Sequence, residues 1–248
     1  MKKISENIFA IEPFPALYIS DLDCTVIADL HLGYETIASE CGVFVPRVQF
    51  EKSMQTMEKI VNKKKTKRII LLGDIKHEFS GTSYHEYREV SAFLDFLSIY
   101  FVEIIIVKGN HDTFIHRVAK KYRIEVFDTF TEKDYLFVHG HKDMDIKKVK
   151  EDKIIMGHEH PSIALFTDIG VKEKLRCFLY GKAYGKEVIV LPAFSFFAEG
   201  SDVNLIPKEE LLSPVLRKVD IDSFKVIGII EGDSFLEFPS VGKLRRFV

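Results

Sequence analysis

The sequence predicts an α/β fold in one domain, with a parallel-rich sheet and a second sheet stacked on it. Three observations lead to this prediction. Apolar runs without alternation, typical of strands buried on both faces, recur through the first two thirds of the chain. Segments with apolar residues at helical spacing separate these runs, which favours right-handed crossovers between parallel strands. The last third holds short β-rich segments punctuated by Gly and Pro.

The first elements open one edge of the predicted sheet. We expect a strand pair over residues 8–20, broken at Pro13-Phe-Pro15, and then a strand that runs to Asp29. Residues 33–46 have no clean period, so we expect them to fold over the strand ends as a roof that contacts the substrate. The central strand is the apolar run that ends at Gly73.

Three helices are expected between the strands. Apolar spacing and capping residues place them at residues 46–62, 83–101 and 112–121. The first has apolar residues at helical spacing and is expected to be amphipathic. The second begins at Ser83-Tyr-His-Glu86, which has the spacing of a capping box. Asp112 can cap the third.

The predicted single domain spans residues 1–248. Its strand-end motifs lie within residues 26–161, and the second, β-rich sheet is expected at about 162–248. The strands of this sheet are expected at residues 175–180, 187–192, 224–230 and 235–238, with a helix near 207–212.

Composition limits the functional classes. The net charge is -2, so the chain has no global basic field, and contact with nucleic acid would need the local clusters at 63–68, 117–123 and 243–246. Three scattered cysteines fit a reducing compartment. The longest apolar stretch, 188–198, is broken by Pro192 and is too short to span a bilayer. We therefore expect a cytoplasmic protein without a membrane partner.

Five predicted strands end in side chains that can bind metals. In chain order these side chains are Asp29, His31, Asp74, Asn110, His139, His158 and His160. Ligands collect outside the carboxyl ends of parallel strands, so we expect the set to converge on one place. A single Asp-x-His or His-x-His would carry little weight. Five such elements in order are hard to explain as structural coincidence.

A pair of divalent ions explains the whole set. Two ions about 3.5–4 Å apart clamp the attacking and leaving oxygens of a phosphoryl displacement. Their mutual repulsion requires an anion between them, and we expect Asp74 to bind one ion with each oxygen. A bridging hydroxide would be the nucleophile and would leave the cluster at about +1. The first ion would also bind Asp29 and His31, and the second Asn110 and His139, with one histidine of the pair His158 and His160 on each.

The remaining histidines are assigned different roles. His111 follows Asn110 directly and is better placed to protonate the leaving oxygen, with Asp112 orienting it. His77 and His141 could lie behind the ligands, face the substrate, or be hydrogen-bonded loop histidines without a role in the chemistry. The histidines on predicted helices, His85 and His116, are expected to be structural.

The ordered motifs resemble the signature of the calcineurin-like metallophosphoesterase superfamily. They are Asp29-x-His31, Gly73-Asp74, Gly109-Asn110-His111-Asp112, His139 and Gly157-His158-x-His160. The resemblance implies a four-layer α/β/β/α sandwich of two mixed sheets, with His111 as the catalytic histidine. It also implies which ligands share an ion. One ion would bind Asp29, His31, Asp74 and His160, and the other Asp74, Asn110, His139 and His158.

A narrower likeness is to the phosphoesterases associated with DNA ligases and helicases. It rests on Ala28-Asp-Leu-His-Leu-Gly33, Gly42-Val-Phe-Val-Pro46, Leu72-Gly-Asp-Ile-Lys-His77 and Leu191-Pro-Ala-Phe194. This subgroup has a Lys after Gly33, where the present chain has Tyr34-Glu35. The likeness implies association with DNA-processing proteins.

We therefore expect a metal-dependent phosphoesterase that hydrolyses phosphodiester bonds, with nuclease action as one form of this activity. A phosphatase or nucleotide hydrolase acting on a small substrate is the alternative, and a non-catalytic scaffold is a third. The partner is a phosphoester, with nucleic acid and nucleotides as candidates. Nitrogen and oxygen ligands without thiolate admit two ions of Mn²⁺, our first expectation, or of Fe, Ni, Co or Zn.

Overall fold

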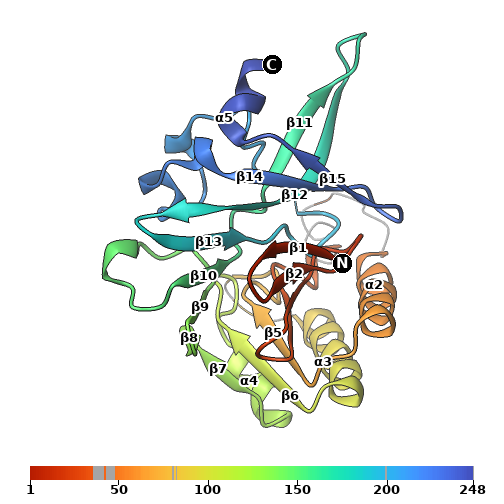
Figure 1. Cartoon of the computed structure of the whole chain (residues 1–248). Coiled ribbons are helices and arrows are strands. Elements are labelled where there is room, and N and C mark those ends of the chain that lie inside the picture. The colour runs from red at the N-terminus through yellow and green to blue at the C-terminus, as the bar shows by residue number, and fades with distance from the viewer. Residues whose placement is uncertain (36–41, 43–47, 80, 82, 199, 248) are drawn as a thin grey trace.

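The computed structural model describes residues 1–248 except 36–41, 43–47, 80, 82, 199 and 248. Two mixed sheets stack on each other, and helices cover the outer face of the first (Figure 1). The predicted roof at 33–46 falls mostly outside the described residues. No helix within the described ranges is long and apolar enough to cross a membrane.

The first sheet has seven strands in sequence order. They are β1 (Lys2–Ser5), β2 (Ile8–Ala10), β3 (Leu17–Ile19), β4 (Cys24–Ile27), β5 (Arg68–Leu72), β6 (Glu103–Val107) and β7 (Glu125–Phe127). Strands β1 to β4 pair antiparallel, and β4 to β7 pair parallel. The sheet is therefore parallel where helices cross over between its strands, as the alternation of strand and helix patterns predicts.

Helices connect the parallel strands, and those with bounds in the described residues are three. They are α2 (Gln49–Lys63), α3 (Tyr84–Tyr100) and α4 (Ile115–Lys121). Their apolar faces pack on alternate residues of the sheet, such as Ile69 and Leu71 of β5, while Ile70 and Leu72 point to the other face. Figure 1 shows α2 and α3 beside each other on this outer face.

The caps of these helices differ in part from the sequence expectation. Ser83 Oγ accepts the Glu86 N–H at 3.1 Å and caps α3, but the Glu86 carboxylate accepts the N–H groups of His77 and Glu78 instead of closing the capping box. The predicted cap of α4 by the Asp112 side chain is wrong, because that carboxylate accepts N–H groups from the loop after β5 and from Gly109 in its own loop. The N-cap residue is Phe114, which makes no side-chain cap.

The second sheet has seven strands in one ladder and an eighth paired to its longest strand. Its order is β15-β14-β12-β13-β10-β9-β8, with β11 on β12. The strands are β8 (Thr129–Glu132), β9 (Tyr135–Val138), β10 (Lys153–Met156), β11 (Ser162–Phe166), β12 (Lys172–Ala183), β13 (Lys186–Val190), β14 (Lys225–Ile229) and β15 (Phe235–Phe238). The expected start of this sheet near residue 162 is therefore too late. Strands β9 and β10 carry predicted ligands at their ends, but they pair with each other, and β10 pairs with β13, so neither belongs to the first sheet.

Two further layers of apolar packing complete the fold. The inner faces of both sheets meet in one core, in which Leu72 and Val107 of the first sheet pack with Phe137, Ile155 and Phe178 of the second. The outer face of the second sheet is covered by α5 (Val241–Leu244) and 3₁₀ turns. These turns are Ile146–Lys148, Lys208–Glu210, Leu216–Lys218, Ile221–Ser223 and Arg245–Phe247. The fourth layer therefore consists of short turns and a single short helix.

Candidate metal centre

The carboxyl ends of five parallel strands from both sheets meet at one edge of the sandwich. Asp29 follows β4, Asp74 follows β5, and Asn110 follows β6; from the second sheet, His139 follows β9 and His158 follows β10. Each strand points its last apolar residues into the core, so the next polar residue is the first that can leave it. The convergence predicted from the apolar runs is present.

The backbone at this edge turns sharply. Five of the predicted ligands have positive φ angles, namely Asp29 (58°), His31 (48°), Asp74 (49°), His158 (68°) and His160 (47°). This left-handed region costs a residue with a Cβ on the order of 1 kcal/mol or more. Such strain is kept only where the surrounding structure holds it, and it is concentrated here on the side chains that could bind metal.

Glycines before the ligands allow neighbouring loops, within the first sheet and between the two sheets, to approach closely. A Cβ on Gly109 would lie 2.1 Å from Oδ1 of Asp74, and one on Gly157 would lie 2.7 Å from Oδ2 of Asp29. A Cβ on Gly73, whose φ is +81°, would lie 2.2 Å from Nδ1 of His139. The functional group of a candidate ligand on a neighbouring loop occupies the space that each Cβ would fill. This explains why glycine precedes Asp74, Asn110 and His158.

The polar side chains form two adjoining groups. Asp29, His31 and His160 offer donor atoms within 4.8 Å of one another, and so do Asp74, His139 and His158. The Nε2 atoms of His31 and His160 are 3.4 Å apart. Oδ1 of Asn110 lies 3.1 Å from Nε2 of His139, beside the second group. A third group, His31, His77 and His111, shares His31 with the first. The first two groups each hold three members of one ligand set implied by the family resemblance, a division that the residues alone left open; the assignment of ligands to ions stays a prediction.

Each aspartate has one oxygen held by the backbone and one that faces imidazoles. Oδ2 of Asp29 and Oδ1 of Asp74 each accept a backbone N–H, at 3.0 and 2.9 Å. The other oxygen of Asp74, Oδ2, lies 3.2 Å from Nε2 of His139 and 4.0 Å from Nε2 of His31. Asp74 therefore faces both groups, but with one oxygen. Oδ1 accepts one N–H and keeps a second lone pair, so the expected use of a separate oxygen for each ion stays a prediction.

Burial and neighbouring charges shift the pKa values of these residues. Burial lowers the pKa of His31 to about 3 and of His158 to about 4. Burial would also lower the pKa of His139, but the Asp74 carboxylate outweighs it and raises that pKa to about 9. For Asp74 itself, burial is opposed by His139 and the neighbouring imidazoles, which hold its pKa below the usual range. The centre is therefore a compact set of mostly buried titratable groups that shift one another's pKa values.

The residues present fit divalent ions. Oδ1 of Asp29 is fully buried and has no hydrogen-bond partner within the described part of the chain, although it lies 3.4 Å from Nε2 of His160. A buried anionic oxygen without a donor is costly, and a cation would satisfy it. The lowered pKa values leave the nitrogens of His31 and His158 unprotonated at neutral pH, the form that binds metal.

His111 borders both groups but bonds differently from the ligands. Its Nδ1 donates to the backbone carbonyl of His77, and its Nε2 lies 3.8 Å from Oδ2 of Asp74. Asp112, expected to orient this imidazole, instead accepts the N–H groups of Ile75 at 2.9 Å and Gly109 at 2.8 Å. The Asp112 carboxylate therefore joins the loops after β5 and β6, and the carbonyl of His77 orients the ring.

Aromatic rings surround the entrance to the centre. The ring of Phe79 lies with its centroid 3.6 Å from that of His111, although Phe79 is half exposed. Tyr34 packs edge-on against His77 at 4.8 Å and stacks on Phe197 at 5.6 Å. Sequence patterns did not identify Phe79 or Phe197, because nothing about an isolated loop aromatic distinguishes it from a packing residue.

His77 and His141, whose roles the sequence left open, both lie at the centre. Nδ1 of His77 is 3.3 Å from Nδ1 of His31, on the side of the first group. His141 packs against the rings of His139 and His158 on the side of the second group, and its buried Nδ1 has no hydrogen-bond partner among the described residues. The histidines expected to be structural, His85 and His116, are exposed on α3 and α4.

Buried polar residues outside the motifs hold the ligand loops. The amide nitrogen of Gln49, at the start of α2, donates to the carbonyls of Leu30 and His31 and to Oγ of Ser195 at 2.8–3.0 Å. Glu159 points away from the histidines on either side and accepts the N–H groups of Leu212 and Ser213. The residue between His158 and His160 is thus an anchor for their turn.

Comparison with known proteins places these features in context. A family model described as calcineurin-like phosphoesterase matches residues 23–190, more than half of the chain. No curated protein matches the sequence.

Among solved structures, the nuclease MPE of Pseudomonas putida is similar with a TM-score of 0.61 and 17% identity, over 90% of this chain and 97% of that one. At this identity the likeness concerns the fold. The phosphoesterase Yfce of E. coli is similar over 88% of this chain and 98% of that one, with 12% identity and a TM-score of only 0.41.

Proposed function

Since this chain belongs to the calcineurin-like phosphoesterase family and is a metal-dependent hydrolase, we propose that it cleaves phosphodiester bonds at a centre that binds two divalent ions. The observation that carries the proposal is that Asp74 lies between two donor groups. It belongs to the group with His139 and His158, and its Oδ2 also faces His31 of the other group. Together they offer carboxylate, amide and imidazole donors without thiolate, which suits Mn²⁺, Fe, Co, Ni or Zn. We expect Mn²⁺ to support activity.

The ligand assignment follows the two groups. One ion would be held by Asp29, His31, His160 and Asp74, and the other by Asp74, Asn110, His139 and His158. When bound, a pair of divalent ions supplies Lewis-acid stabilisation of the phosphoryl oxygens and water of lowered pKa. The chain's own residues then determine the position of the phosphate and the path of the leaving-group proton.

His111 is the residue proposed to move that proton. Its Nδ1–H is tied to the carbonyl of His77, so Nε2 is the nitrogen that gains and loses a proton. Nε2 faces the centre, 3.8 Å from Oδ2 of Asp74. A proton held at Nε2 can pass to the leaving oxygen as the P–O bond breaks. Asp112 is proposed to position this residue by holding the Gly109 loop.

A phosphatase or nucleotide hydrolase acting on a small substrate is the second candidate. The observation that favours it is the ring of Phe79 beside His111, together with Tyr34 beside His77. These rings would contact an aromatic leaving group or a base next to the phosphate. In support of the diesterase, the similar fold from P. putida is that of a nuclease.

A substrate screen separates the two candidates. Protein stripped with chelator is reloaded with each metal and assayed on aryl phosphodiesters, aryl monoesters, nucleotides and DNA, with Asp74→Asn as the blank. We expect diester cleavage to be the fastest, and His111→Ala to reduce it on the order of 10²–10⁴-fold with metal content retained. His116→Ala, on the exposed face of α4, is the matched control and should keep wild-type turnover. Turnover of monoesters alone would establish the small-substrate phosphatase instead.

A further inference from the structure

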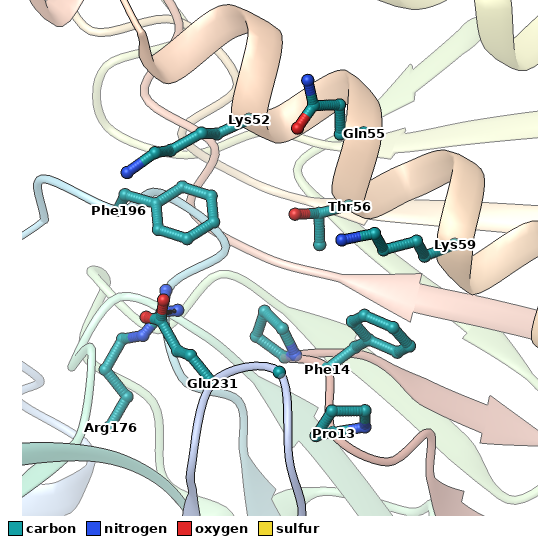
Figure 2. A pocket seen from close by; sticks show the side chains of 11 residues that line it. Pro13, Phe14, Lys52, Gln55, Thr56, Lys59, Arg176, Phe196 and Glu231 are labelled. Carbon is teal, nitrogen blue, oxygen red and sulfur yellow. Dashed lines mark hydrogen bonds and ion pairs between the residues drawn. The ribbon is translucent and has the colours of Figure 1, made fainter.

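A groove separate from the metal-centre residues runs along helix α2. It has a volume of about 530 Å³ and lies between α2, the loop that joins β2 to β3, and the turn that joins β14 to β15 (Figure 2). Lys52, Thr56 and Lys59 line it from the helix, and Phe14 and Phe196 line it from the other walls. The three helix residues lie within roughly 60° of one another around the helix axis, so they form one continuous face.

The groove is electropositive. Its ionisable lining residues are Lys52, Lys59, Arg176 and Glu231. Glu231 is paired with Arg176 at 2.5 Å, while neither lysine forms an ion pair with any residue that the structure describes. The lining therefore carries a net charge of +2 on its unpaired lysines. Cations that face a concave surface without a protein partner are suited to an anionic ligand.

Two cationic side chains of the groove, Lys52 and Arg176, pack on the ring of Phe196. Nζ of Lys52 and Cζ of Arg176 each lie 5.2 Å from the centroid of the Phe196 ring, and Figure 2 shows both side chains beside it. Arg176 is fixed further, because it donates to the carbonyls of Ala193 and Ser195 at 3.0 and 3.1 Å. Cation–π contacts of this kind hold a charge in place without neutralising it.

The groove leads away from the metal centre. Gln49 bonds to the carbonyls of Leu30 and His31, so the start of α2 lies against a ligand loop. From Gln49, the helix advances about 5 Å to Lys52 and about 15 Å to Lys59. The neighbour of Phe196 in the chain is Phe197, which stacks on Tyr34 at the entrance of the centre. One face of the molecule thus connects the centre to the groove.

We propose that this groove binds the phosphate backbone of a nucleic-acid strand that flanks the bond cleaved at the metal centre. The proposal rests on the proposed phosphodiesterase function and specifies its substrate class. Lys52 and Lys59 are about 10 Å apart along the helix, a separation that two phosphates of one strand can span but one small anion cannot. A polymer of phosphodiesters is also the anion that a diesterase would hold on both sides of the bond it breaks.

Binding without turnover tests the groove. Fluorescence anisotropy is measured in chelator with labelled single-stranded and duplex oligonucleotides, for the full chain and the variant Lys52→Gln/Lys59→Gln. We expect affinity to fall about tenfold near physiological salt, and the slope of log affinity against log salt to become shallower by about 1.4 for the single strand or about 1.8 for the duplex. Phe196→Leu should weaken binding about threefold, because the two cations lose their common support.

A charge-matched control separates the groove from general electrostatics. Lys150→Gln/Lys243→Gln removes the same charge from two exposed lysines that do not line this groove. If this control weakens binding as much as the groove variant, or if polyglutamate displaces the oligonucleotide as well as unlabelled oligonucleotide does, the assignment of a nucleic-acid site is wrong.

Parallel assays keep this test independent of the proposed function. Hydrolysis of bis-p-nitrophenyl phosphate, which is too small to reach the groove, should be the same in wild type and groove variant. If wild type fails to cleave it with any metal while the groove variant still loses oligonucleotide binding, the diesterase proposal fails and the groove stands. If it is cleaved and the groove variant binds as wild type does, only the groove proposal fails.

Discussion

Replacement of Gly73 by alanine tests whether the close approach of the two sheets shapes the metal centre. Gly73 has a φ of +81°, which costs an alanine roughly 1–2 kcal/mol. A Cβ there would also lie 2.2 Å from Nδ1 and 2.6 Å from Cγ of His139. His139 is buried beside Asn110 and Asp74, so it cannot move freely, and such overpacking costs about 1–3 kcal/mol. Together the two effects predict a loss of about 2–5 kcal/mol in the free energy of unfolding.

Gly185 provides a matched control. It lies in the turn between β12 and β13 with a φ of +83°, and a Cβ there would meet nothing within 4 Å. Gly185→Ala should therefore lose only the roughly 1–2 kcal/mol of backbone strain. The reduced entropy of the unfolded chain is the same in both variants and cancels in the comparison.

Urea unfolding of the metal-free variants measures the difference. We expect Gly73→Ala to be less stable than Gly185→Ala by about 1–3 kcal/mol at equal m-values, and to lose at least about tenfold in diester turnover because His139 is displaced. Gly185→Ala should keep wild-type turnover. If the two variants unfold within about 0.5 kcal/mol of each other, the steric argument about His139 is refuted.

Four other substitutions test separate parts of the structure. Asp74→Asn keeps the acceptor for a backbone N–H but removes the charge that faces both groups, so metal content measured by mass spectrometry should fall and turnover should drop by ~10³-fold or more. Gln49→Leu leaves two buried carbonyls without donors and should cost about 2–3 kcal/mol in urea unfolding; a smaller loss would mean that water replaces the amide. Phe79→Ala should reduce turnover several-fold with unchanged stability, since the ring is half exposed yet packs on the imidazole of His111; equal turnover would remove the ring from the site. Burial would raise the pKa of Asp202, but hydrogen bonding, first of all from Lys172, holds that pKa below the usual range. The Asp202 carboxylate therefore stabilises the fold above about pH 4. This contribution is lost as pH falls through the lowered pKa. The stability difference between wild type and Asp202→Asn should therefore shrink between pH 6 and pH 3, and a constant difference would contradict the assignment.

Two of the three basic clusters noted in the sequence lie away from the edge that carries the candidate ligands. The cluster at residues 63–68 precedes β5, whereas Asp74 follows it, so about 16 Å of strand separates its end from the ligand edge. The cluster at 243–246 belongs to the layer on the outer face of the second sheet. The lysines that line a groove near the centre are Lys52 and Lys59, which are isolated in the sequence and are brought together only by the helical period.

The apolar runs and the polar residues that follow them were sufficient to predict the strands and the candidate ligands. A strand buried on both faces cannot contain a carboxylate or an imidazole, so Asp29, Asp74 and His139 had to mark strand ends, and parallel strands bring such ends to one edge. The sequence also predicted Ser83 as the N-cap of α3, because a cap bonds to a backbone N–H only a few residues away in the chain.

Tertiary structure alone decided which groups meet. His158 and His160 are alike in the sequence, and only the strained turn between them, anchored by Glu159, directs one to Asp74 and the other to Asp29. The pairing of β10 with β13 likewise depends on contacts between distant segments. Asp112 looked like a helix cap, but two backbone N–H groups from separate loops are better partners for a buried carboxylate than one exposed helix end. Local patterns determine what each residue can do, whereas the partner it finds depends on segments that the chain brings together only when it folds.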